Sequence, residues 1–140
     1  MENYGLIGIA ASLALSAVGS ALGAGAAGMA AIGAWKKCFA QNKPAPFMLI
    51  AFVGAPLTQT IYGMILMGAL KNAHNEMQLG GGLLGGLAMG ISAWFQGKAG
   101  ASASDALAET GKGFGNYIIV LGLIETVALF VMVFLLSAVG

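Results

Sequence analysis

The run YIIVLGLIETVALFVMVFLL, residues 117–136, is long enough to cross a bilayer, because a membrane-spanning helix takes about 20 apolar residues. One carboxylate, Glu125, interrupts this run close to its middle. A charge at the bilayer centre costs on the order of 3 kcal/mol, so such residues are rare and typically mark an ion path or a proton relay. A glutamate paired with another helix, without a transport role, is the alternative explanation. Glu125 is therefore the first candidate site residue.

The composition favours a membrane protein throughout. Hydrophobic residues make up 59% of the chain and charged residues 8%, against about 25% charged in an ordinary soluble domain. The formal charge of +1 and the lack of arginine leave no basic surface for nucleic acid. Cys38 is the one cysteine, so it forms no disulfide within the chain. We interpret it as a bystander thiol.

Apolar runs and polar connections predict an all-α membrane protein with four transmembrane helices in two tandem hairpins. Residues 1–74 form the first hairpin, with helices at about 4–35 and 47–70, and residues 75–140 form the second, with helices at about 79–106 and 114–138. The first run follows Glu2 rather than a basic segment and is too long for a signal peptide, so we expect it to be retained. Pro44 and Pro46 keep the first connection from being helical.

The lysines predict the orientation, because positive charge in short loops tends to stay in the cytoplasm. Lys36, Lys37 and Lys43 lie in the first connection and Lys112 in the third, whereas the second connection holds Lys71. We therefore expect the loops near 36–46 and 107–113 to be cytoplasmic and both termini to lie outside.

The helices alternate in type. The first and third are rich in glycine and alanine at spacings of three or four, which lets helix backbones approach closely in lipid. The second and fourth carry bulky residues that suit a lipid-facing or outer layer: Phe47, Phe52, Ile61, Tyr62, Met64, Leu66, Met67, Phe130, Met132, Phe134 and Leu135. Two hairpins with the same alternation indicate a duplicated unit, with the glycine-rich helices innermost.

Aligning the two halves places Gln59 opposite Glu125. Counting from the third connection at about 1.5 Å per residue places Gln96 and Glu125 at one level, and Thr58 lies near that level too. Pro56 removes a backbone donor in mid-helix and so frees a carbonyl about one turn earlier. Such oxygen ligands suit a hard cation such as Na⁺, whereas a proton site needs little beyond a carboxyl and one hydrogen-bond partner. Helix packing by Thr58, Gln59 and Gln96 is the alternative interpretation.

Three short motifs carry a resemblance that covers essentially the whole chain. They are PLTQ at 56–59 followed by YG at 62–63, QGK at 96–98 and LIET at 123–126. At these residues the sequence resembles the duplicated proteolipid of V-type and A/V-type rotary ATPases, in its sodium-translocating branch. Members of that family form the membrane rotor ring.

The resemblance implies a site and a set of partners. Glu125, Thr58, Gln59, Gln96 and the carbonyl of Ala55 would surround Na⁺, and the matching tyrosine, Tyr62, would donate a hydrogen bond to the glutamate. Identical protomers would form a ring in a bacterial cell membrane, turning against a stator subunit and seated on central-stalk subunits. ATP would be hydrolysed on other subunits, so this chain would not itself be an enzyme.

Two other functions stay open at this point. The same rotor protein could carry H⁺ on Glu125, or the chain could be a four-helix channel or a structural ring. A pore would need polar residues repeated along one helix face, whereas here polarity is concentrated at one level. An intramembrane hydrolase is less consistent still, because no serine, histidine or second carboxylate is expected beside Glu125.

Overall fold

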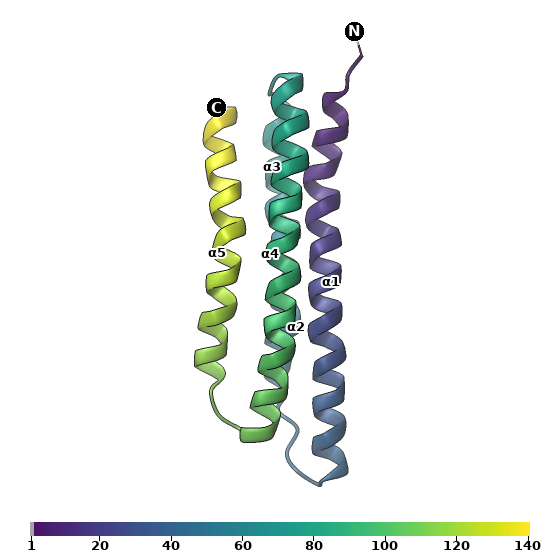
Figure 1. Ribbon diagram of the computed structural model, residues 1–140, viewed down its shortest axis with the longest axis vertical. Helices are drawn as coiled ribbons and strands as arrows, with labels where there is room; N and C mark the ends of the chain where they lie inside the picture. Colours follow the sequence, from purple (N-terminus) through teal and green to yellow (C-terminus); the bar gives the residue numbers. More distant parts are fainter. Residues whose placement is uncertain (1) are drawn as a thin grey trace.

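The computed structural model describes residues 2–140 as a bundle of long helices that run along one axis (Figure 1). The elements are α1 (Gly5–Ala40), α2 (Leu49–Gly54), η1 (Ala55–Leu57), α3 (Thr58–Leu70), α4 (Asn75–Thr110) and α5 (Phe114–Val139). The segments α2, η1 and α3 follow one another without a break and act as one rod, Leu49–Leu70. The chain from residue 2 to 140 is thus all-helical, with four rods joined by short connections.

The helices extend further than the apolar runs that predicted them. The first continues to Ala40 rather than ending near residue 35, and α4 spans Asn75–Thr110 rather than about 79–106. Hydropathy marks where apolar surface stops, but lysine, glutamate and glutamine are good helix formers and let a helix continue into water. The true end of α4 is set by Gly111, which has φ 67° and closes the helix in the left-handed conformation.

Three of the rods are long and apolar enough to cross a membrane: α1, Leu49–Leu70 and α5. The fourth, α4, is as long as α1 but is not among them. Its glycines and its polar residues, Ser92, Gln96 and Lys98, lower its apolar character. More residues are buried in α4 than in any other helix, so its neighbours enclose most of that polarity.

Glycines hold α1 and α4 in backbone contact. A Cβ added at Gly19 or Gly23 of α1 would lie closer than 3.0 Å to the α4 backbone, and one added at Gly90 or Gly97 would meet the α1 backbone in the same way. This contact is the close approach that small residues permit between helices in lipid. The α1–α4 pair is therefore the rigid reference against which the rest of the bundle packs.

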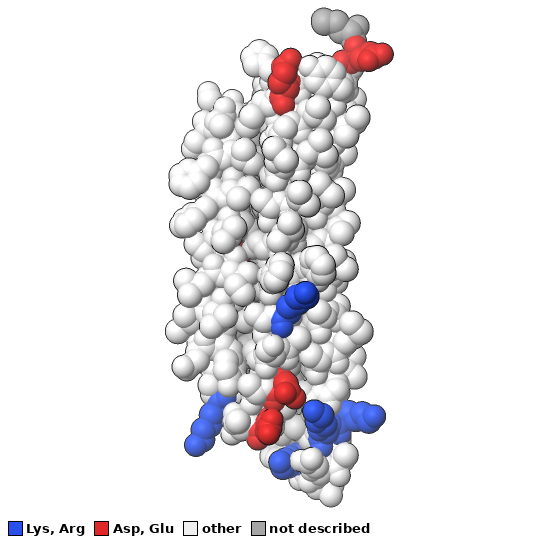
Figure 2. Space-filling view, in the orientation of Figure 1, with Lys and Arg blue, Asp and Glu red and all other residues white. Residues whose placement is uncertain are grey.

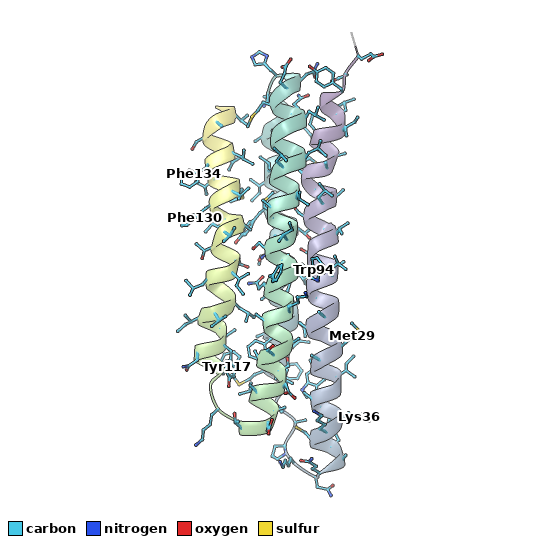
Figure 3. The ribbon with its side chains drawn as sticks, in the orientation of Figure 1. Met29, Lys36, Trp94, Tyr117, Phe130 and Phe134 are labelled. Carbon is cyan, nitrogen blue, oxygen red and sulfur yellow. The ribbon has the colours of Figure 1, made fainter. Side chains whose placement is uncertain are left out.

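Some of the large side chains of the Leu49–Leu70 rod point into the bundle, contrary to expectation. Phe52 and Leu66, expected in a lipid-facing or outer layer, are fully buried. The ring of Phe52 lies 5.5 Å from that of Phe114, centroid to centroid, so bulky side chains fill the space beside the thin α1–α4 pair. Phe130 and Phe134 of α5 do project away from the bundle, with 54% and 67% of their surface exposed (Figure 3).

Charges gather at the two ends of the bundle (Figure 2). The connections 41–48 and 111–113 lie at the same end, where most of the visible lysines are, and both termini lie towards the other end (Figure 1). Lys98, farther from this end on α4, extends over the Trp94 ring at 4.8 Å from its centroid. Between the ends the surface is almost wholly uncharged in this view (Figure 2).

Replacing Gly90 with Ala should destabilise the bundle, because the new Cβ would press on the backbone carbonyl of Leu15. Overpacking of this kind costs about 1–3 kcal/mol. Gly80→Ala in the same helix is the control, since nothing lies within 4 Å of a Cβ there. Thermal unfolding in detergent, followed by helical circular dichroism, should show a lower Tm for Gly90→Ala only. Equal Tm values for the two variants would contradict the backbone contact.

Candidate functional site

The site is built around the hydroxyl of Thr58, where α3 meets α5. Thr58 Oγ1 is hydrogen-bonded to Glu125 Oε1, and it lies 3.0 Å from Gln59 Oε1 and 3.0 Å from the carbonyl oxygen of Ala55. Thr58 and Glu125 are half-buried, whereas Gln59 is completely buried. Four oxygens from two helices thus converge at mid-length of the bundle.

Pro56 explains why α2 and α3 do not join as one regular helix here. It lies in the 3₁₀ turn η1, in which the backbone N–H of Thr58 donates to the carbonyl of Ala55. The tightened turn brings that carbonyl and the Thr58 hydroxyl to the same side. Gly23 of α1 leaves room for the turn, since a Cβ at Gly23 would lie 3.0 Å from that of Pro56.

Gln96 of α4 closes the site from behind. Gln59 Nε2 donates to Gln96 Oε1 at 2.9 Å, and Gln96 Nε2 donates to the carbonyl of Leu121 at 3.0 Å. Gln96 is 1% exposed, so this amide pair is shielded from surrounding solvent or lipid. The structure therefore brings Ala55, Thr58, Gln59, Gln96 and Glu125 together in one cluster.

The register of α4 against α5 differs from the count made along the sequence. Gln96 contacts the carbonyl of Leu121, about one turn away from Glu125, rather than Glu125 itself. The reason is that α4 runs past the start of α5, and the connection turns back before α5 begins (Figure 1). Gln59 bridges the resulting offset between Gln96 and the Thr58–Glu125 pair.

Tyr62 lies one turn beyond Thr58 on α3 and is half-buried. It packs against the apolar cluster of Leu66, Met89 and Ala128. The hydrogen bonds formed within residues 2–140 do not include one from Tyr62 to Glu125, so the arrangement implied by the resemblance is not the one seen here.

Ser92 belongs to the cluster but was not expected from the sequence. Its hydroxyl donates to the carbonyl of Ile124 at 2.9 Å, and Gln59 Nε2 lies 3.4 Å from its oxygen. Ser92 is 5% exposed. A signal was available, because Ser92 precedes Gln96 by one helical turn and so shares its face of α4. Serine is common on helix faces made of small residues, so its presence there does not by itself indicate a site residue.

The chemistry of the cluster is that of a single negative charge surrounded by neutral oxygens. Thr58 has one hydroxyl hydrogen, yet three acceptor oxygens face it: those of Ala55, Gln59 and Glu125. A hydroxyl donates to one acceptor at a time, and the Ala55 carbonyl already accepts the backbone N–H of Thr58, so the oxygens of Gln59 and Glu125 compete for the hydroxyl hydrogen. The site is suited to binding a cation or a proton.

Comparison with known proteins gives one family. The family of the ATP synthase C subunit matches residues 79–137, which are most of α4 and nearly all of α5 and include Ser92, Gln96 and Glu125. The match lies within the second hairpin and leaves α1 and the Leu49–Leu70 rod outside it. A comparison with curated proteins finds no match.

A carbodiimide that reacts with protonated carboxyls in apolar surroundings should label Glu125 selectively. The other acids, Glu2, Glu76, Asp105 and Glu109, are exposed to solvent. Peptide mass spectrometry after brief labelling of the detergent-purified protein at neutral pH should find the adduct on α5. Comparable labelling of Glu109 and Glu125 would show that Glu125 does not lie in an enclosed site.

Proposed function

We propose that this chain forms the rotor ring of a V-type rotary ATPase and that it carries Na⁺ on Glu125 across the membrane. The observation that carries the proposal is the convergence of Glu125 Oε1, Gln59 Oε1 and the Ala55 carbonyl on Thr58 Oγ1. The match to the ATP synthase C-type family supports the rotor assignment. Sodium and the V-type branch rest on the ligand set and on the motifs of both hairpins.

Sodium is favoured over a proton because of the number of oxygens. A cation leaving water loses its hydration oxygens, and an isolated charge in a low dielectric is very costly, so a site must replace them. Four oxygens converge here, and Gln96 Oε1 holds the Gln59 amide from the α4 side. Glu125 balances the charge. A proton on Glu125 would need only one acceptor, fewer than the oxygens that face it here.

A channel is less consistent with the structure. Buried serines on α1 do extend the polar region beyond one level, contrary to expectation, but Ser12 and Ser16 donate to carbonyls of their own helix. Hydroxyls used in this way stabilise packing rather than line a water-filled path. The binding oxygens stay at a single level of the bundle, as a carrier site requires.

The proposed ring places α1 and α4 innermost and the Leu49–Leu70 rod and α5 outermost, in contact with lipid. The exposed Phe130 and Phe134 support an outward-facing α5 (Figure 3). At the lysine-rich end, Lys37 and Asp105 form an exposed ion pair at 3.5 Å beyond the apolar part of the bundle. That end is proposed to be cytoplasmic and to meet the central stalk, while a stator subunit would approach Glu125 from α5.

The proposed cycle follows from the charge of Glu125. With Na⁺ bound, the site is neutral and can pass through lipid at low cost; without it, the bare carboxylate is held back by the cost of burying a charge. Rotation therefore moves only loaded sites through lipid. Release requires a polar environment or a positive group offered by the stator.

Sodium should protect Glu125 from carbodiimide at neutral pH, and less strongly as the pH falls and protons compete for the carboxylate. Gln59→Ala should lose most of this protection while Glu125 stays reactive, because Gln59 contributes an oxygen to the site. The measurement is the labelling rate against Na⁺ concentration at several pH values. No protection of the wild-type protein at any pH would make the chain a proton carrier.

Glu125→Gln should abolish ATP-driven ion uptake into vesicles that contain the complete complex. The glutamine amide carries no negative charge to neutralise a cation, and it does not exchange a proton as a carboxylate does near neutral pH. Glu2→Gln makes the same chemical change at an exposed position and should leave uptake near the wild-type rate. Uptake that survives Glu125→Gln would remove Glu125 from the transport path.

A further inference from the structure

We infer that Ser92 is a positioning residue that fixes the direction of the Gln59 amide, so that Gln59 presents its oxygen, and not its NH₂ group, to the bound ion. This inference rests on the proposed function of the Glu125 site and assigns a residue to it that does not touch the ion.

The Gln59 side chain has two chemically different ends of nearly equal size. Its oxygen lies 3.0 Å from Thr58 Oγ1, on the side of Glu125. Its Nε2 has two hydrogens and faces two acceptors on α4: Gln96 Oε1 at 2.9 Å and Ser92 Oγ at 3.4 Å. Turned by half a rotation, the same side chain would bring two N–H donors towards the ion and would repel it.

The backbone of α5 sets the direction of these hydrogen bonds. A carbonyl oxygen can only accept, and the Ile124 carbonyl takes the single hydrogen of the Ser92 hydroxyl at 2.9 Å. Ser92 is then left with lone pairs towards Gln59. In the same way the Leu121 carbonyl takes a hydrogen from Gln96 Nε2, which turns Gln96 Oε1 towards Gln59. Two main-chain carbonyls thus make α4 an acceptor surface for one amide group.

Because Gln59 and Ser92 are buried, the loss of a hydrogen bond between them is costly. Gln59 is 0% exposed and Ser92 5%, so little solvent can replace a lost partner. Without the Ser92 hydroxyl, one Gln59 hydrogen loses its acceptor in the ion-binding orientation, so that orientation is no longer favoured as strongly over the turned one. Removal of Ser92 therefore weakens cation binding without removing any oxygen that binds the cation.

The test compares Ser92→Ala with Ser104→Ala. Ser104 lies on the same helix, is equally enclosed at 0% exposed, and its hydroxyl has no hydrogen-bond partner within residues 2–140. The probe is Na⁺ protection of Glu125 from carbodiimide. Ser92→Ala should raise the Na⁺ concentration for half-protection about fivefold, the loss expected for one net hydrogen bond, and Ser104→Ala should not change it.

Two further measurements separate positioning from general damage. At low pH without Na⁺, where Glu125 is protonated in every variant, Ser92→Ala should label as fast as the wild type. In a Gln59→Ala background, adding Ser92→Ala should cause no further loss of Na⁺ protection, because the effect passes through Gln59. Ser92→Cys keeps the volume with a weak acceptor and should show the same direction of change if the alanine variant does not assemble.

Equal half-protection in the wild type and Ser92→Ala, or an equal further loss in the Gln59→Ala background, would overturn the inference while leaving the proposed function intact. A wild-type protein that Na⁺ does not protect would instead overturn the proposed sodium function.

Discussion

The structure depends on one constraint: the half-buried Glu125 carboxylate lies at mid-length of an apolar bundle and has to be neutralised there. A buried charge is tolerated only when oppositely charged or hydrogen-bonding groups replace water around it. Residues 2–140 supply hydrogen bonds and neutral oxygens but no cationic side chain bonded to this carboxylate, so the compensating charge has to come from outside the protein. In the proposed function, the oxygens of Thr58, Gln59 and Ala55, which converge beside Glu125, receive it.

The rest of the bundle holds these groups in register. Backbone contact between α1 and α4 at Gly19, Gly23, Gly90 and Gly97 fixes the two inner helices to each other. Onto this pair, η1 brings its 3₁₀ turn beside Gly23, and α4 anchors α5 through the carbonyls of Leu121 and Ile124. Gly90 and Gly97 of α4 thus pack against α1, while Ser92 and Gln96 of the same helix bond to α5.

Much of the candidate site could be predicted from the sequence, because its residues are polar and lie within otherwise apolar runs. Glu125 and Gln59 stand out in apolar runs, and Pro56 predicts an irregular turn, although the carbonyl found at the site is that of Ala55, which also accepts the Thr58 N–H. The register of α4 against α5 could not be predicted, since it depends on how far α4 continues beyond the membrane and on the glycine turn at Gly111. For that reason the count along the sequence predicts Gln96 opposite Glu125, whereas Gln96 lies opposite Leu121. The role inferred for Ser92 could not be predicted, because it depends on the direction of a hydrogen bond and not on the type of residue. The buried side chains of Phe52 and Leu66 show that large side chains alone do not identify a lipid-facing surface.

The most direct measurement of the central claim is the number of sodium ions bound by the purified protein. The two hairpins have similar alternation, but only the second carries a carboxylate at mid-depth. Equilibrium binding of radioactive Na⁺ at neutral pH should therefore saturate at one ion for each 140-residue chain. Saturation at two ions for each chain, or the absence of saturable binding, would contradict the placement of the ion on Glu125.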